Sequence, residues 1–386
     1  MQPYKQVAIG ALVSYKIYPA QFGGQKGIAL FYRYVAKLIP IHIFTVQENT
    51  ESEAGITLHH TLASGFLKYL SIFSFFKIKK LVKKLQLSHL IIEHPYLGWL
   101  GYLLKKSCGI SIIIHSHNIE ALRFKSNGKW WWKILWHYEK WVHQQADINF
   151  FITENDKAFA INHYKVSASV CHVITYGTVI NIAPTVLQTN QAKDIICAQH
   201  QINSSDTVLL FNGTLDYLPN IKAIDFIVNE LNPILLKAPL FKYKIIVCGK
   251  NLPASYNNLI SYPNVLYTGF VADINVYFLG ASIFINPVID GGGIKTKLVE
   301  ALAYNLSCIS TQSGAIGVLP TDAGDKLIIV NDYEAESFAK AIVNMPKQLS
   351  ISPLFFDKFY WGSIAKKAVN IMLAPPSPIL KKREKI

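Results

Sequence analysis

The feature that most constrains the fold of this chain is the regular alternation of short apolar segments with longer segments of helical period. The apolar segments are rich in Val and Ile, which is typical of strands buried on both faces of a parallel sheet. The helical segments between them predict crossover helices. The pattern runs through residues 7–174 and begins again at 207–330. We therefore predict an α/β protein with two doubly wound, Rossmann-like domains.

Composition divides the chain further. A stretch rich in Asn, Gln, Thr and Ala, which begins near Pro184, has no clear period and predicts a linker. Pro353 precedes a last apolar-aromatic helix, and three prolines then lead into a basic tail. The predicted parts are an N-terminal domain (1–180), a linker (181–206), a C-terminal domain (207–352), a terminal helix that crosses back to the N-terminal domain (353–373) and the tail (374–386). The strands predicted within the two domains are Val7–Ser14, His42–Val46, His89–Glu93, Ser111–His115, Ile148–Ile152, Val170–Ile174, Thr207–Phe211, Tyr243–Val247, Val265–Tyr267, Ala281–Ile285, Leu306–Ser310 and Leu327–Val330.

The charge of the chain is unevenly distributed. Its 38 Lys and Arg against 24 Asp and Glu give a net charge of +14. Residues 1–185 hold 20 basic and 9 acidic side chains, a net of +11, whereas residues 186–386 hold 18 and 15, a net of +3. This asymmetry predicts an anionic surface or substrate facing the first half. Nucleic acid is disfavoured as that partner because the chain has no recognised nucleic-acid-binding module.

Other features indicate the class of protein and its compartment. Hydrophobic residues make up 51% of the chain and charged residues 16%, which excludes wholesale disorder. The five cysteines are widely spaced, with no CxxC pair or Cys/His cluster of zinc-site spacing, which predicts a reducing compartment and no structural metal. The N-terminus lacks a secretory signal pattern, and no 18-residue window is uninterruptedly apolar. We expect a cytoplasmic protein.

The most informative segment is 286–303, in which a strand ends, three glycines follow and an apolar helix begins. Gly291–Gly293 let the backbone approach a ligand closely, and the helix N-terminus offers free N–H groups. Lys295 and Lys297 add two cations in the first turn, where they oppose the helix dipole unless an anion binds. The segment therefore predicts a diphosphate site. A glycine-rich turn with two solvated lysines is the alternative.

Glu300 lies about one and a half turns into the same helix, beside the apolar Val299 and Ala301. A carboxylate can accept two hydrogen bonds from vicinal hydroxyls, so Glu300 suits a ribose next to the diphosphate. A surface glutamate without a ligand is the alternative.

Four segments make the sequence recognisable when they are taken together. They are Asn212–Asn220 (NGTLDYLPN), Tyr267–Asp273 (YTGFVAD), Pro287–Ala303 and Ser307–Gly317. In this order and spacing they resemble the family 4 retaining glycosyltransferases, which have the GT-B fold. The first half matches more loosely, through Gly23-Gly24-Gln25 after the first strand and through His115–Glu120 (HSHNIE).

The resemblance implies two Rossmann-like domains that face a central cleft, with a nucleotide-sugar donor on the C-terminal domain and an acceptor on the N-terminal domain. It implies a hexosyltransferase-type enzyme that moves a sugar from a UDP- or GDP-linked donor, with retention and without a metal or other cofactor. The acceptor would be a glycan or a lipid-linked glycan in cell-surface polysaccharide or lipopolysaccharide biosynthesis. The catalytic residues so implied are His117, Lys295 and Glu300. The donor-binding residues are Asn212, Gly213, Thr214, Asp290, Gly291, Gly292, Gly293, Lys295, Lys297 and Glu300. The acceptor-binding residues are Gly23, Gly24, His117, Asn118 and Glu120.

The sequence departs from the pattern of this family in two places. The family often has two acidic residues eight positions apart here, and the earlier position is Gly292, so the contact to the donor sugar is lost or moves to Asp290. The Arg and Lys that commonly follow the first strand of the C-terminal domain fall near Thr214 and Asn220. A phosphate-binding pair is therefore missing, and Lys295 with Lys297 must compensate for it. We interpret these changes as those of a branch variant.

His117 follows the strand Ser111–His115, at the carboxyl end where open α/β sheets place ligands. The resemblance implies that a histidine near this point touches the donor sugar. His117 is the better match, although His115 stays open, and a structural histidine is the alternative. For Gly23 and Gly24, the alternative is a plain tight turn.

The first half also holds two groups of basic residues beside aromatic ones. Such surfaces suit anionic membrane interfaces, so we expect a peripheral position on the inner face of the membrane. The alternative is that the tryptophans pack in the core and the lysines are solvated. One group is Lys77, Lys79, Lys80, Lys83 and Lys84 after the run Phe66–Phe76, and the other is Arg123, Lys125, Lys129, Lys133 and Lys140 among Trp130, Trp131, Trp132, Trp136 and Trp141.

Two other classes of function compete with a glycosyltransferase. A non-catalytic GT-B protein that binds a nucleotide sugar or activates a partner is the alternative that stays open. A Rossmann dehydrogenase is disfavoured because no G-x-G-x-x-G follows a first strand.

Overall fold

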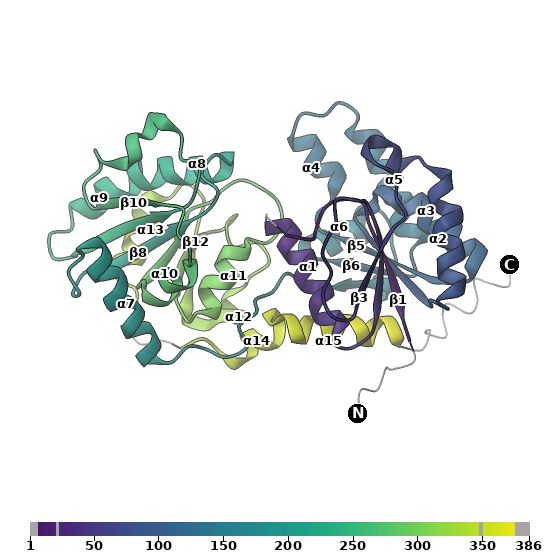
Figure 1. Ribbon diagram of the computed structural model, residues 1–386. Helices are drawn as coiled ribbons and strands as arrows, with labels where there is room; N and C mark the ends of the chain where they lie inside the picture. The colour runs from purple at the N-terminus through teal and green to yellow at the C-terminus, as the bar shows by residue number, and fades with distance from the viewer. Residues whose placement is uncertain (1–6, 21–22, 347–349, 375–386) are drawn as a thin grey trace. The chain divides into compact units, whose positions relative to one another are not determined.

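The structure, a computed structural model, describes residues 7–20, 23–346 and 350–374. The chain folds into two compact units (Figure 1). Unit 1 is built from the chain up to Tyr176 and from Trp361 onward, and unit 2 is Gly177–Tyr360. Most of the predicted basic tail lies outside the described residues.

Unit 1 is a seven-stranded parallel sheet in the order β3-β2-β1-β4-β5-β6-β7, with helices on both faces (Figure 1). Its strands are β1 (Ile9–Val13), β2 (Ile41–Thr45), β3 (Ile56–His60), β4 (His89–Glu93), β5 (Ser111–Ser116), β6 (Ile148–Phe151) and β7 (Cys171–Val173). Its helices are α1 (Gly23–Ala36), η1 (Gly65–Tyr69), α2 (Ile72–Lys84), η2 (Pro95–Leu97), α3 (Gly98–Cys108), α4 (Glu120–Ser126), α5 (Trp132–Gln145), α6 (Glu154–His163), η3 (Ala168–Val170) and α15 (Trp361–Leu373).

The alternation of side chains along β1 shows how the sheet of unit 1 is covered. Ile9, Ala11 and Val13 face a core that is completed by α1 and α15. Leu12 faces the opposite core, to which α2, α3 and α5 contribute. A central strand with apolar residues on both faces is the continuous hydrophobic run that a doubly covered parallel sheet requires.

Unit 2 is a six-stranded parallel sheet in the order β10-β9-β8-β11-β12-β13. Its strands are β8 (Thr207–Asn212), β9 (Tyr243–Cys248), β10 (Val265–Gly269), β11 (Ile283–Asn286), β12 (Ser307–Thr311) and β13 (Leu327–Val330). Its helices are α7 (Val186–His200), α8 (Leu218–Asp225), a π-helical stretch (Phe226–Leu231), α9 (Asn232–Leu236), η5 (Ala254–Leu259), α10 (Ile274–Gly280), α11 (Thr296–Ala303), α12 (Pro320–Ala323), η6 (Gly324–Lys326), α13 (Ala335–Val343) and α14 (Pro353–Phe359). The predicted fold class, with two doubly wound parallel sheets, is confirmed.

The structure differs from the predicted boundaries in two respects. Within the predicted linker, Val186–His200 form the helix α7, which packs on α10 of unit 2 and bonds His200 Nε2 to the Tyr277 hydroxyl at 2.9 Å. The predicted terminal helix is two helices, because the backbone of Tyr360 is extended and separates α14 from α15. Of these two, α14 belongs to unit 2 and α15 to unit 1.

Candidate functional site

The order of strands in unit 2 marks one point on its sheet as a site for a ligand. β8 and β11 are neighbours, but the chain continues from β8 to β9 on one side and from β11 to β12 on the other. Open parallel sheets bind ligands beyond the carboxyl ends of their strands at such a reversal. β8 ends at Asn212 and β11 at Asn286, and the loop that follows β11 holds the three glycines.

This glycine loop presents backbone to the surface and leads into α11. Gly291 and Gly293 have φ angles of +85° and +72°, which residues with a side chain rarely adopt. The helix begins at Thr296 after Lys295, which supplies no side-chain cap. The first N–H groups of α11 therefore have no partner within the helix and can receive an anion.

Lys297 connects α11 to the end of β8. Its Nζ donates to the backbone oxygen of Asn212 at 3.2 Å and to Asn220 Oδ1 at 3.0 Å, and it lies 4.3 Å from the centre of the Phe211 ring. Burial, together with the nearby Lys295 cation, lowers the pKa of Lys297 from its ordinary 10.5 to about 7. Both of its hydrogen-bond acceptors are neutral. The lowered pKa therefore means that burial of the charged form is unfavourable, and a bound anion would offset this cost.

Lys295 is held by the glycine loop itself. Its Nζ donates to the backbone oxygens of Gly291 at 2.6 Å and Gly293 at 3.3 Å. Burial lowers its pKa to about 8, although Asp290 acts in the opposite direction. Asp290 is paired with Lys222 of α8 at 2.7 Å. The carboxylate that could replace the missing acid at Gly292 is thus already engaged.

The other predicted donor residues surround the same point. Asn220 closes the loop after β8, since its Nδ2 donates to the Thr214 oxygen at 2.8 Å. A Cβ on Gly213 would lie 2.7 Å from that amide nitrogen, so a side chain at this position would displace Asn220. Glu300 is exposed on α11. The pKa of Tyr304 is raised mainly by burial and, to a smaller extent, by the charge of Glu300. The side-chain oxygen of Asn212 is buried without a hydrogen-bond partner.

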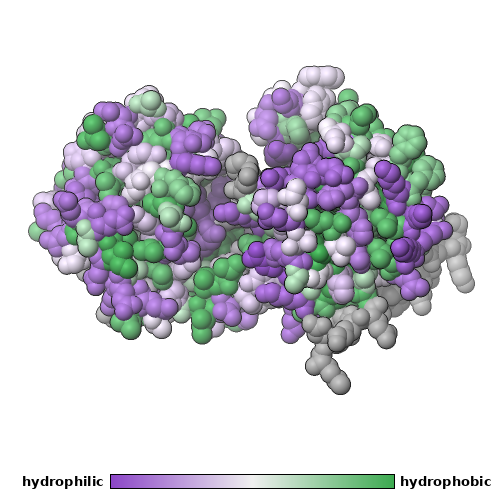
Figure 2. Space-filling view, viewed as in Figure 1, coloured by the Kyte–Doolittle hydropathy of each residue, from purple (hydrophilic) through white to green (hydrophobic). Residues whose placement is uncertain are grey.

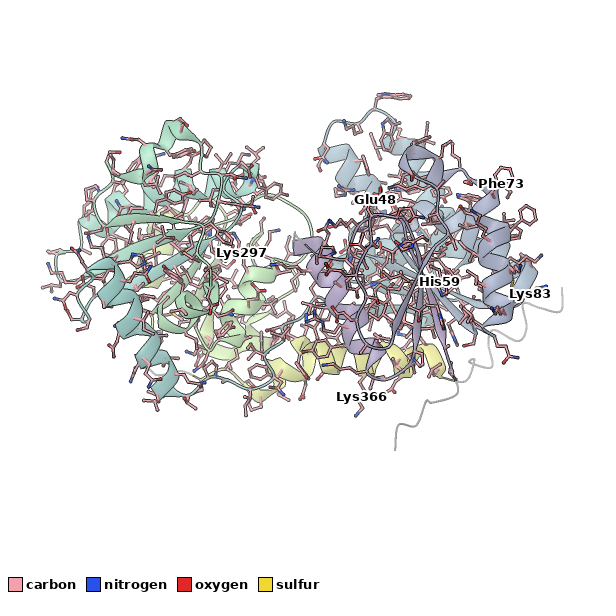
Figure 3. The ribbon with its side chains drawn as sticks, in the orientation of Figure 1. Glu48, His59, Phe73, Lys83, Lys297 and Lys366 are labelled. Carbon is pink, nitrogen blue, oxygen red and sulfur yellow. The ribbon has the colours of Figure 1, made fainter. Side chains whose placement is uncertain are left out.

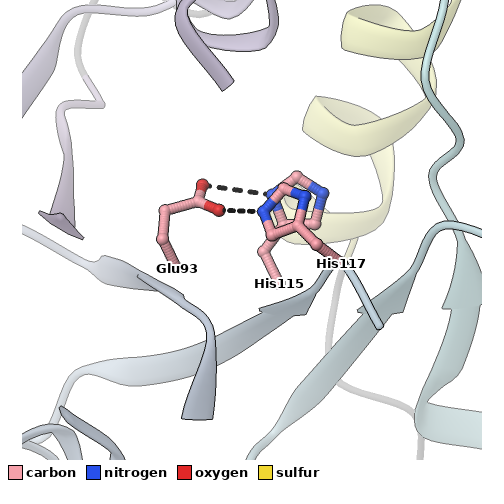
Figure 4. Close-up of side chains that lie close together, drawn as sticks. All are labelled: Glu93, His115 and His117. Carbon is pink, nitrogen blue, oxygen red and sulfur yellow. Dashed lines mark hydrogen bonds and ion pairs between the residues drawn. The ribbon is translucent and has the colours of Figure 1, made fainter. Parts of the chain in front are cut away.

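In unit 1, the corresponding reversal of strand order lies between β1 and β4. Glu93 ends β4 beside β5, which carries His115 and is followed by His117. The Glu93 carboxylate bonds His115 Nδ1 at 3.1 Å and His117 Nε2 at 2.5 Å (Figure 4). It also accepts from the Tyr32 hydroxyl. All three members of this Glu93–His115–His117 cluster are buried.

The charges within this cluster follow from its contacts. Burial alone would raise the pKa of Glu93, but the two histidines outweigh it and hold that pKa well below its ordinary value. Burial, followed by the neighbouring His115, lowers the pKa of His117 to about 4. At neutral pH His117 is therefore neutral, its Nε2–H donates to the ionised Glu93, and its Nδ1 accepts from the Tyr176 hydroxyl at 2.7 Å.

The predicted catalytic residue His117 thus has both ring nitrogens bonded within unit 1. Its imidazole is buried, and in this arrangement neither nitrogen is available to a sugar. Asn118, the next residue, is partly exposed, and its backbone oxygen accepts from the Ser116 hydroxyl at 2.8 Å. Gly23 and Gly24 form the exposed first turn of α1 rather than a turn of their own.

Glu120, predicted as an acceptor residue, belongs to a second group of side chains. One of its oxygens lies 3.2 Å from His94 Nδ1, and the other accepts from Arg123 and from the Tyr96 hydroxyl. Burial would raise the pKa of Glu120, but His94 and Arg123 lower it to about 2. The His94 ring is 4.6 Å from that of His117, with 14% of its side chain exposed. His94 is therefore the more accessible imidazole.

A metal ion is one group that the cluster could hold. The ligating atoms of Glu93, His115 and His117 lie within 4.8 Å of one another, and this is the group of that kind found in the described part of the chain. The same atoms already hydrogen-bond each other. One ring nitrogen of the cluster, His115 Nε2, is buried without a hydrogen-bond partner. The other nitrogen of His115, Nδ1, contacts the Glu93 carboxylate.

Sequence reasoning missed several members of both groups. Glu93 and Tyr176 lie 24 and 59 positions from His117, and no local pattern connects them. Lys222 lies 68 positions from Asp290, and Asn220 lies 77 positions from Lys297. The position of Glu93 and His94 at the carboxyl end of a predicted strand is a signal that could have found these two residues.

Comparison with known proteins connects this geometry to a family. The family model described as Glycosyltransferase Family 4 matches residues 23–180, and the one described as Glycosyl transferases group 1 matches residues 206–348. Together these matches span most of the chain.

Individual proteins are similar to the chain at two levels. A protein described as an uncharacterized 44.6 kDa protein in the cps region of Klebsiella pneumoniae is 30% identical over 159 residues, 39% of this chain and 40% of that protein. The apo lipopolysaccharide outer core galactosyltransferase WaaB shares the fold with a TM-score of 0.64, 14% identity and coverage of 95% and 99% of the two chains. HepE from Anabaena in complex with UDP shares it with a TM-score of 0.63, 11% identity and coverage of 98% and 100%. At these identities the structural likeness shows the fold alone.

Proposed function

The chain belongs to the family 4 glycosyltransferases of the GT-B fold, and we propose that it is a retaining, metal-independent enzyme acting in cell-surface polysaccharide or lipopolysaccharide biosynthesis. Its donor would be a UDP- or GDP-linked sugar, and its acceptor a glycan or a lipid-linked glycan. The single observation that carries this proposal is the arrangement of Lys295 and Lys297 at the start of α11, beside a glycine loop at the strand reversal of unit 2.

The donor diphosphate would lie on the glycine loop. When the bond between the sugar and the diphosphate breaks, negative charge develops on the diphosphate, and groups fixed at that point lower the barrier. Lys295, Lys297 and the first N–H groups of α11 supply positive charge there without a metal ion. The lowered pKa of Lys297 supports this role, because a bound diphosphate restores the charge that burial disfavours.

Glu300 would bind the ribose of the donor. It lies on α11 beyond the two lysines and is exposed, so its carboxylate can face a nucleoside whose diphosphate rests on the helix start. A carboxylate that accepts from both ribose hydroxyls recognises the sugar of any nucleotide. It would therefore not discriminate between UDP and GDP.

Retention requires that the acceptor oxygen bond the anomeric carbon on the face that the diphosphate leaves. The acceptor proton would pass to the departing phosphate oxygen, so we assign no protein side chain as the base. The acceptor would be bound by unit 1 near Gly23, Gly24, Asn118 and Glu120. His117 would act there by positioning, since both of its nitrogens are bonded to unit 1.

The relatives support the substrate class. The Klebsiella pneumoniae protein is described by its place in a cps region, WaaB by its galactosyl transfer to the lipopolysaccharide outer core, and HepE by its complex with UDP. On this basis UDP is the first nucleotide to test. A cytoplasmic position, at the inner face of the membrane, is part of the proposal.

A non-catalytic protein that binds a nucleotide sugar is the second candidate. One observation favours it: Gly292 stands where the family often has an acidic residue, and Asp290, the nearest substitute, is paired with Lys222. Such a protein would bind the nucleotide but neither hydrolyse nor transfer the sugar.

Calorimetric titration of the chain with UDP and GDP in the presence of EDTA tests the proposal. We expect micromolar binding of one nucleotide, and a loss of at least about tenfold in Glu300→Ala, because two hydrogen bonds to the ribose are removed. Glu336→Ala, an exposed glutamate in the first turn of α13, is the matched control and should bind like wild type. Binding that needs a divalent cation, or that Glu300→Ala leaves unchanged, would contradict the assignment. Binding without donor hydrolysis or transfer would favour the non-catalytic candidate.

A further inference from the structure

A cluster of large apolar side chains stands exposed on unit 1. It comprises η1, the first turns of α2 and the residues between them, and we call it the apolar patch. Its members are 44% to 75% exposed, and they fall within eleven consecutive positions of the chain. They are Phe66, Leu67, Leu70, Ile72, Phe73 and Phe76.

The register of α2 accounts for this exposure. Ser74, Ile78 and Val82 are buried at a four-residue spacing, which fixes the face that packs on unit 1. Phe73 and Phe76 then lie on the outward face by helical geometry. Phe73 and Lys83 project away from the body of unit 1 in Figure 3, and Figure 2 shows apolar residues beside strongly hydrophilic ones over this part of the surface. The patch is thus a regular feature of the helix.

A belt of lysines adjoins the apolar patch. The segment 54–92 contains no Asp or Glu, so its net charge comes from lysine alone. In the described chain, no carboxylate forms an ion pair with any of these lysines. The lysine belt consists of Lys68, Lys77, Lys79, Lys80, Lys83 and Lys84.

Lysines directly adjoin the apolar side chains along α2. Lys77 and Lys79 follow Phe76, and Lys80, Lys83 and Lys84 lie about 6 to 17 Å beyond Phe73 and Phe76 along the axis, at 1.5 Å per residue. A membrane interface likewise places acyl chains next to phosphates. A protein partner would be expected to face Arg, Trp and Tyr, because Lys is depleted from protein–protein interfaces. Here there are six lysines and no arginine.

We propose that the apolar patch and the lysine belt form a docking surface for a membrane that contains anionic lipids. The patch inserts at the boundary between headgroups and acyl chains, and the lysines contact the lipid phosphates. Docking is peripheral, since among residues 7–20, 23–346 and 350–374 no helix has the length and apolarity to cross a bilayer. This inference rests on the membrane position in the proposed function and gives it a surface. Its test does not involve the nucleotide site, because this surface belongs to unit 1 and the glycine loop to unit 2.

The second basic and aromatic group of the sequence contributes less than expected. Trp136 and Trp141 pack against the hydrophobic cores of unit 1, which is the alternative considered for the tryptophans. Trp130 remains 83% exposed in the turn between α4 and α5. We therefore confine the docking surface to η1 and α2.

Co-flotation of the full chain with vesicles tests the proposal, and it needs no nucleotide. One set of vesicles is one-third phosphatidylglycerol in phosphatidylcholine, and the other is phosphatidylcholine alone. We expect wild type to prefer the anionic vesicles at least about tenfold and to lose most of this preference at ~0.5 M salt. Phe73→Ser with Phe76→Ser should lower binding about tenfold or more, and Lys80→Gln with Lys84→Gln should lower it several-fold and weaken its salt dependence.

Matched controls come from unit 2. Leu240→Ser with Phe270→Ser removes two apolar side chains that are at least as exposed as Phe73 and Phe76, and Lys237→Gln with Lys242→Gln removes two exposed cations. Both should bind vesicles within about twofold of wild type. Thermal melts of every variant show that unit 1 remains folded. The proposal is overturned if wild type ignores anionic vesicles, if the α2 variants bind as well as the controls do, or if the patch instead mediates self-association that Phe73→Ser with Phe76→Ser abolishes.

Discussion

Binding of a nucleoside diphosphate to unit 2 should draw protons from solution, because two lysines there have lowered pKa values. With a pKa of about 7, Lys297 is about one-tenth protonated at pH 8, so a ligand that restores its charge takes up ~0.9 proton. Lys295, with a pKa of about 8, adds ~0.5 proton at the same pH. At pH 6 both are already charged, and the uptake by the lysines falls to ~0.1 proton.

Calorimetry in buffers of different ionisation enthalpy measures this uptake as the slope of the binding enthalpy. UDP or GDP, whichever binds, is titrated at pH 6 and pH 8, with the nucleoside as the control ligand that lacks phosphates. The Lys295→Met variant should lose the ~0.5 proton of Lys295, and the share of Lys297 should also fall, because the Lys295 cation no longer lowers the pKa of Lys297.

The expected slope is ~1.4 protons for the diphosphate at pH 8 and close to zero for the nucleoside. A slope near zero for a tightly bound diphosphate at pH 8 would refute the reasoning. It would mean that both lysines are charged in the free protein, and that an anion is not needed to offset their burial.

Two further predictions concern stability. The free energy of unfolding of wild type minus that of Lys297→Met should rise by ~2 kcal/mol from pH 6.5 to pH 9. Above its folded pKa, Lys297 is uncharged in the native state and still charged in the unfolded state, so wild type gains stability with pH. Urea denaturation followed by circular dichroism measures both proteins, and a difference that does not change with pH would contradict this. Glu93→Gln should lower the stability of unit 1 by ~2 kcal/mol at pH 7, and Tyr176→Phe, which removes one hydrogen bond to the same cluster, by ~1 kcal/mol. Tryptophan fluorescence measures both, since all seven tryptophans lie in unit 1, and equal losses would show that the Glu93 charge contributes nothing.

Strand positions were predictable because buried parallel strands leave a strong local signal. His89–Glu93 and Leu327–Val330 match the observed strands residue for residue, and β3 (Ile56–His60) was missed, since its two histidines break the apolar run. The helix α7 was missed because few of its side chains are apolar and buried. Its N-terminus did carry a signal, a capping box between Thr185 and Gln188.

The candidate site was predictable only where it follows the chain. Gly291–Lys297 could be assigned to a helix start because glycines, lysines and an apolar helix are consecutive. The hydrogen-bond partners of Lys297 could not be predicted, since Asn212 and Asn220 lie 85 and 77 positions away. The same holds for His117, for which the family resemblance implied contact with the donor sugar. Its actual partners come from β4 and from the end of unit 1 at Tyr176.

The position of α15 determines when unit 1 can finish folding during synthesis. This helix, near the end of the chain, buries Trp361, Ile364 and Val369 in the same core as β1 and α1. Unit 2, Gly177–Tyr360, separates the two parts of unit 1 by 184 residues. At about 5–20 residues per second, a ribosome needs about 10–40 s to make that stretch. During that time the face of the first sheet that α15 covers stays exposed to solvent. The domain that is synthesised first is therefore the one completed last.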